Sequence, residues 1–157
     1  MVLKHHKILK EIIKEKKKDP RVVSILLFGS LAKGTAHSKS DIDIEIIYKR
    51  GKWKETQEHI GGIKIDYEYW PKKKLMTKLN SKPYLCYQYL SERILYDPKG
   101  FAKKIKKQAR NYFNKNKKAT NIWKEWEKDY LRKKKIGLKI KSVETFYKEL
   151  KKRFNKK

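Results

Sequence analysis

Residues 28–48 read FGSLAKGTAHSKSDIDIEIIY, and this stretch decides the fold because it joins two strand-like runs through a short turn. Upstream, Val22–Phe28 is apolar and partly β-branched, which is typical of a strand buried on both faces. Downstream, residues 41–48 alternate acids with isoleucines, so the acids share one face of a strand and the isoleucines the other. The sequence therefore predicts two strands, with a turn that begins at Gly29 and Ser30.

The acids of the second run are candidate ligands for a metal ion. Asp41 and Asp43 are two residues apart on a strand, so their carboxylates project side by side at about 6–7 Å and repel one another unless a cation lies between them. Residues 63–70 form another alternating run, with Asp66 on its polar face. If the two runs are neighbouring strands, the three carboxylates form the hard oxygen site that suits Mg²⁺, with room for two ions. A solvated polar face without an ion is the alternative.

The turn upstream of the acids is a candidate site for phosphate. Gly29 permits a close backbone approach, and the N–H groups of a turn that leads into a helix bind phosphate. Ser30 adds a hydroxyl donor, and Lys33 can supply positive charge nearby. The stretch is not a Walker A loop, because Thr35 and Ala36 stand where Lys and Ser or Thr must follow. A metal–triphosphate complex needs both a phosphate cradle and a carboxylate strand; a plain tight turn is the other interpretation.

Together these two motifs resemble the signature of the DNA polymerase β-type nucleotidyltransferase superfamily: a Gly-Ser pair at 29–30, ten residues, and then Asp41 and Asp43. The short chain is most similar to the minimal nucleotidyltransferases of that superfamily. Gly34 and Ser40 also stand where such proteins commonly carry them. The resemblance covers roughly residues 20–98. It implies an α+β fold, a small mixed β-sheet flanked by helices as in the polymerase β palm.

The resemblance also implies an activity, the Mg²⁺-dependent transfer of a nucleoside monophosphate from an NTP, with ATP expected, to an acceptor hydroxyl. Pyrophosphate would leave, and two Mg²⁺ ions would be held by the catalytic residues Asp41, Asp43 and Asp66. The nucleotide-binding residues would be Gly29, Ser30, Lys33, Gly34 and Ser40. Leu31 stands where many minimal members have Arg, so part of the phosphate grip is expected to be missing. The alternative is a catalytically inactive module of the same fold that binds RNA or a partner protein.

The charge of the chain favours a polyanionic partner. The 157 residues contain 44 Lys and Arg against 17 Asp and Glu, a formal net charge of +27. Residues 101–157 alone contain 22 bases and 5 acids. We therefore predict a nucleotidyltransferase domain over 1–98 and a basic helical extension over 99–157. RNA is an expected acceptor, and the aromatic residues of the extension, spaced as on helices, serve either to pack or to stack on bases.

Other expected partners and the location follow from the resemblance and from what the chain lacks. Minimal nucleotidyltransferases often act beside HEPN-type toxins, as antitoxins that adenylylate them, so a HEPN-type partner protein is a second expected acceptor. A small hydroxylated molecule such as an aminoglycoside is a third, which the basic extension fits badly. With Cys86 alone, neither an internal disulfide nor a cysteine zinc cluster is expected. No apolar run reaches the roughly 18 residues that cross a bilayer, so a cytoplasmic protein without membrane contact is expected.

The rest of the chain is predicted to alternate helices and strands. Leu9, Ile12 and Ile13 recur at near-helical spacing, which predicts a helix that stops before Pro20. Further elements are expected as a connection at 51–62, helices at 75–79 and 84–93, and a short strand at 93–98. Glu45 and Glu68 are expected to be solvated or paired with lysines, and His5 has no identifiable metal-ligand partner.

Overall fold

The computed structural model describes residues 3–155, with side chains except those at positions 143, 150 and 153–155. The chain forms two compact units, Met1–Arg110 and Asn111–Lys157. The first unit contains the sheet, and the second contains the two C-terminal helices. The boundary that the sequence predicts between residues 98 and 99 stays a prediction. Within the described residues, no helix has the length and apolar character needed to span a membrane.

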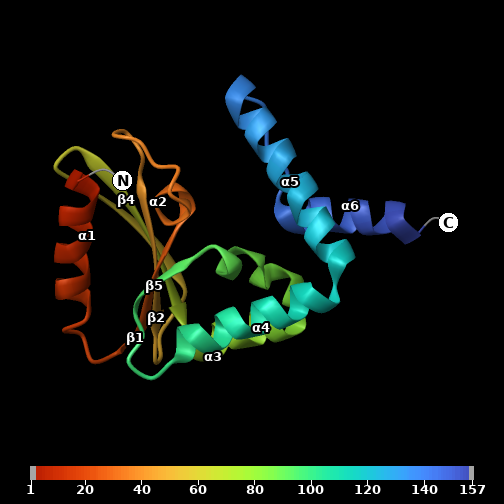
Figure 1. Ribbon diagram of the computed structural model, residues 1–157. Coiled ribbons are helices and arrows are strands. Elements are labelled where there is room, and N and C mark those ends of the chain that lie inside the picture. Colours follow the sequence, from red (N-terminus) through yellow and green to blue (C-terminus); the bar gives the residue numbers. More distant parts are fainter. Residues whose placement is uncertain (1–2, 156–157) are drawn as a thin grey trace. The chain divides into compact units, whose positions relative to one another are not determined.

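A five-stranded mixed sheet is the centre of the first unit (Figure 1), which confirms the predicted α+β fold. Its strands, in sequence order, are β1 (Val22–Phe28), β2 (Ile42–Tyr48), β3 (Lys54–Ile60), β4 (Ile63–Pro71) and β5 (Arg93–Tyr96). In space the order is β3-β4-β2-β1-β5. Strand β1 is antiparallel to both of its neighbours, whereas β2 and β4 run parallel. The two acid-bearing strands are therefore adjacent, as the site requires.

One face of the sheet is hydrophobic and packs on α1 (Leu3–Lys16), which lies along that side in Figure 1. The alternating isoleucines of β2 and β4 are buried there together with one stripe of α1: Ile8, Leu9, Ile12, Ile42, Ile44, Ile46, Ile63 and Ile65. This burial fixes the register, because a slip by one residue would turn every isoleucine to the opposite face. The acids of both strands must then lie on the other face, which we call the polar face.

The deep part of the polar face is covered by α3 (Lys72–Ser81), the 3₁₀ helix η1 (Pro83–Leu90) and α4 (Phe101–Lys115). Tyr89 of η1 donates its hydroxyl proton to Glu45 on β2 at 2.7 Å, and Gln108 of α4 bonds Asn80 of α3 at 3.4 Å. The sequence predicts residues 84–93 as helical, and the structure gives most of them the tighter 3₁₀ winding, with three residues per turn. That winding places Cys86 and Tyr89, both buried, on the same side.

Strand β3 was not predicted from the sequence. The sequence predicts only a connection over residues 51–62, yet Lys54–Ile60 pairs antiparallel with β4 along its whole length. All seven of its residues are exposed, so no side of the strand needs apolar residues and no alternation marks it. A charged, polar strand at the edge of a sheet also disfavours pairing with another chain.

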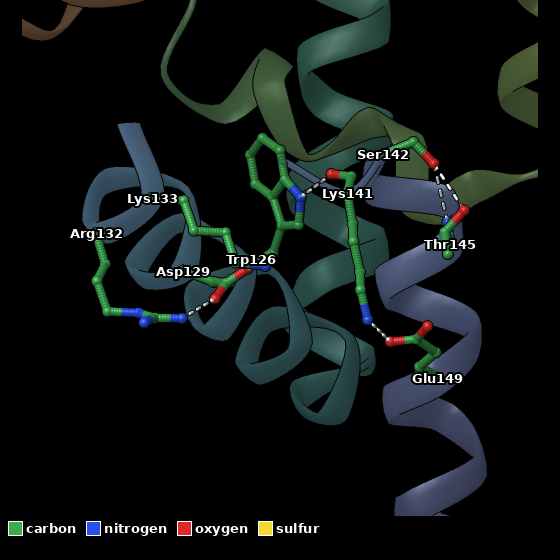
Figure 2. A network of polar contacts seen from close by, with 8 residues as sticks. All are labelled: Trp126, Asp129, Arg132, Lys133, Lys141, Ser142, Thr145 and Glu149. Atoms are coloured by element: carbon green, nitrogen blue, oxygen red, sulfur yellow. Dashed lines mark hydrogen bonds and ion pairs between the residues drawn. The ribbon is translucent and has the colours of Figure 1, made fainter. Parts of the chain in front are cut away.

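The second unit contains α5 (Lys117–Ile136) and α6 (Val143–Asn155), which confirms two of the predicted basic helices. Gly137 ends α5 with a positive φ of 70°, and the Trp126 indole N–H then donates to the carbonyl oxygen of Lys141 at 3.2 Å. Figure 2 shows this contact beside two ion pairs, Asp129 with Arg132 and Lys141 with Glu149. The Trp126 hydrogen bond joins α5 to the loop and the Lys141–Glu149 ion pair joins the loop to α6, and residues of both helices line a hollow of about 400 Å³.

Candidate active site

The turn after β1 lies directly against the carboxylate of Asp43. Gly29 opens the short helix α2 (Gly29–Lys33) with a φ of +74°, and its neighbour Phe28 pairs with Asp43 across β1 and β2. A Cβ added at Gly29 would lie 2.3 Å from Asp43 Oδ2 and 3.2 Å from Asp43 Cγ. Only glycine combines this backbone conformation with this approach. The two motifs singled out in the sequence therefore meet at one point.

The parallel register of β2 and β4 sets acids opposite acids on the polar face. Asp43 pairs with Asp66, and two residues further on Glu45 pairs with Glu68. Like charges directly opposite one another on neighbouring strands are destabilising, so each pair needs compensation. At the first pair it comes from Lys64, whose Nζ lies 3.2 Å from Asp66 Oδ2. Lys64 was not among the predicted site residues, although it is one alternation before Asp66 and so on the same face.

The donor set fits a divalent cation in its chemistry. Asp41, Asp43 and Asp66 offer hard carboxylate oxygens, and a positive group, the Lys64 ammonium, already lies 3.9 Å from Asp41 and 3.2 Å from Asp66. Over residues 3–155, however, no three His, Cys, Asp or Glu side chains are grouped as a metal site. The structure therefore brings the predicted ligands to adjacent strands without closing them around one point.

The predicted nucleotide-binding residues lie in and after α2. Ser30 is in its first turn, Lys33 is exposed at its end, and Gly34 ends it in the left-handed conformation at φ +74°. Leu31 is 1% exposed and belongs to the hydrophobic core. Its side chain anchors α2 to the core, and as an aliphatic group it offers no charge to a phosphate.

The loop before Asp41 is fixed from α1. His5 is fully buried and donates its Nε2 proton to the carbonyl oxygen of Ser40 at 2.7 Å, while the Ser40 hydroxyl accepts from the His37 backbone N–H at 2.9 Å. His5 thus positions the residue before Asp41, a role that was not predicted from the sequence. The sequence does contain a pattern that predicts the burial of His5, because His5 continues the α1 stripe of Ile8 and Ile12 at helical spacing.

The expectation for Glu45 is wrong. Glu45 is completely buried under η1, where Tyr89 donates to it, and burial raises the pKa of its carboxyl to about 8. Glu68 accepts the indole N–H groups of Trp53 at 3.1 Å and of Trp70 at 2.7 Å. Glu45 is therefore not solvated, whereas Glu68 is only half-buried and keeps access to solvent beside its two indole donors. Tyr89 follows Glu45 by 44 positions, a distance over which a strand pattern reveals no contact.

Comparisons with known proteins agree with this geometry. The family model described as Polymerase beta, Nucleotidyltransferase matches residues 10–101. Among solved structures, a nucleotidyltransferase-like protein from Exiguobacterium sibiricum 255-15 superposes with a TM-score of 0.52 at 14% sequence identity. That match covers 64% of this chain and 37% of the other, so it shows a shared fold over part of a longer protein. No curated protein matches the sequence.

Proposed function

The chain belongs to the polymerase β nucleotidyltransferase family, and from that premise we propose that it moves a nucleoside monophosphate from an NTP to an acceptor hydroxyl, with release of pyrophosphate. The observation that carries the proposal is the close approach of the Gly29 backbone to the Asp43 carboxylate, which leaves no room for a Cβ at position 29. It places the backbone of a phosphate-type turn beside a carboxylate strand, and a metal-bound triphosphate needs these two partners side by side.

Each candidate residue has a distinct role in this proposal. Asp41, Asp43 and Asp66 would hold Mg²⁺, with two ions in the family's arrangement. When bound, Mg²⁺ would neutralise phosphate charge and activate the acceptor hydroxyl. The backbone at Gly29 and the hydroxyl of Ser30 would orient the outer phosphates of the NTP, with ATP expected. The remaining nucleotide contacts are proposed for Lys33, Gly34 and Ser40.

RNA is the acceptor that the second unit favours. The basic side chains of α5 include the exposed residues Lys117, Lys118, Lys124, Lys128, Arg132, Lys134 and Lys135. Its aromatic residues are turned to internal contacts, since Trp123 is 7% exposed and stands edge-on to Trp126, which in turn contacts Tyr130. RNA would therefore be held through phosphate contacts of the lysines, with little stacking of bases on these rings.

The test is transfer of label from each α-labelled NTP in turn, with Mg²⁺, offered total RNA and whole-cell protein as acceptors. Label on RNA supports the proposal, and RNA binding should then weaken by orders of magnitude between about 50 and 200 mM salt. Label on one protein would make the chain an adenylylating regulator, as expected for a HEPN-type partner. A folded protein that transfers nothing and binds no nucleotide with Mg²⁺ would support the inactive module instead.

Gly29→Ala should weaken metal binding at the site more than it lowers the stability of the fold. The positive φ costs a non-glycine residue about 1–2 kcal/mol, and the added Cβ must displace the Asp43 carboxylate 2.3 Å away. Because that carboxylate is the end of a flexible side chain, moving it adds little to the loss of stability. We expect binding of Mn²⁺, used as a probe for Mg²⁺, to weaken by roughly tenfold or more in a calorimetric titration.

Gly100→Ala is the matched control for this prediction. Gly100 also has a φ of +74°, and a Cβ added there meets no atom within 4 Å. The control should lose about 1–2 kcal/mol of unfolding free energy in chemical denaturation and keep its Mn²⁺ affinity. Equal Mn²⁺ affinities for the two variants would contradict the placement of Asp43 in the metal site.

A further inference from the structure

Lys64 is placed between two of the acids that would bind metal. It is the second residue of β4, on the polar face, and its side chain is 34% exposed. Its Nζ lies 3.2 Å from Asp66 Oδ2 on the same strand and 3.9 Å from Asp41 Oδ2, which directly precedes β2. The ammonium therefore bridges the two strands at the end of the sheet where Gly29 approaches Asp43.

This position answers an electrostatic need of the sheet. Asp43 and Asp66 are direct partners in the parallel register, and Asp41 adds a third negative charge one alternation away. Without a positive group these carboxylates repel one another, which destabilises the strand pair and disperses the ligands. Lys64 supplies that charge, so the carboxylates stay oriented in the absence of metal.

We infer that Lys64 is the resident counter-ion of Asp41 and Asp66 and competes with a divalent cation for their oxygens. This inference rests on the proposed function, because it takes the same carboxylates as the metal ligands. Lys64 is then a positioning residue that sets the metal affinity. The ammonium and the ion are attracted to the same carboxylate oxygens, and two cations that close together repel, so the flexible lysine must move out when the ion binds.

The test is a titration of the full-length, nucleotide-free protein with Mn²⁺, with free Mn²⁺ followed by electron paramagnetic resonance. Lys64→Met removes the charge at nearly constant volume and should bind Mn²⁺ about tenfold more tightly than the wild type. Lys64→Arg retains the charge and should stay within about twofold of the wild type. Lys52→Met is the control for net charge, because Lys52 is exposed and makes none of these contacts, and its effect should be small.

Thermal unfolding establishes that each variant is folded, and Lys64→Gln is a second neutral variant that should tighten Mn²⁺ binding in the same direction. Unchanged or weaker binding in both neutral variants overturns the inference, and the proposed transfer reaction would stand. If none of these proteins binds Mn²⁺, neither the wild type nor the Lys64 variants nor Asp66→Asn, the metal part of the proposed function is overturned together with the inference.

Discussion

Asp41→Asn is expected to lower kcat/KM for nucleotidyl transfer by about 10³-fold or more. A catalytic metal ion supplies several kcal/mol of charge stabilisation in the transition state, and each ~1.36 kcal/mol corresponds to a tenfold change in rate. The substitution keeps the volume of the side chain and removes its charge. Asp41 is exposed, and its ion pair with Lys64 is long, at 3.9 Å. The unfolding free energy should therefore change by less than about 1 kcal/mol.

The measurement is the initial rate of label transfer at saturating acceptor and NTP well below its KM, which gives kcat/KM for the NTP, beside a denaturation curve for the same preparation. Glu11→Gln is the matched control, because Glu11 is exposed on α1 and its loss removes the same charge far from the polar face. Its rate should equal that of the wild type. A folded Asp41→Asn variant with undiminished transfer would show that the reaction does not use this carboxylate.

The sequence was sufficient to predict those parts of the fold that a periodic pattern encodes. Val22–Phe28 and Ile42–Tyr48 are strands, as the apolar run and the alternating run predict, and the sequence also allows β2 and β4 as neighbours. Gly29 and Asp43 lie in the single stretch 28–48, but their approach depends on the antiparallel pairing of β1 with β2, which the sequence does not predict. Whether Asp41, Asp43 and Asp66 are metal ligands stays a prediction.

The parts that were not predicted depend on contacts distant in sequence or on the lack of any buried side. Strand β3 has no apolar alternation because it is an exposed edge. His5 reaches Ser40 and Tyr89 reaches Glu45 over 35 and 44 positions, so neither partner is visible from local spacing. Lys64 could have been found, because period two places it on the face of Asp66.

Buried Glu45 makes the stability of the fold depend on pH. Burial raises the pKa of its carboxyl to about 8 from the usual 4.5, opposed by the hydrogen bond from Tyr89 and reinforced by the charge of Glu68 across the strand pair. Between these two pH values the folded protein holds a proton that the unfolded chain has released. Stability is therefore fully present below about pH 4.5, falls as the pH rises and levels off above about pH 8.

Glu45→Gln should raise the unfolding free energy at pH 7 by roughly 3 kcal/mol, because glutamine is neutral in both states while it retains an acceptor for the Tyr89 hydroxyl. The pH dependence of stability between about 4.5 and 8 should become shallower, although buried Glu92, whose pKa is also raised well above its usual value by burial, keeps part of it. Denaturant unfolding at several pH values measures both effects, with exposed Glu55→Gln as a control that should change little.

A Glu45→Gln variant that is less stable than the wild type at pH 7, with an unchanged pH dependence, would mean that Glu45 is ionised in the folded state. The positive charge of Lys78, which opposes the rise in the pKa of Glu45, would then outweigh the burial of the carboxylate.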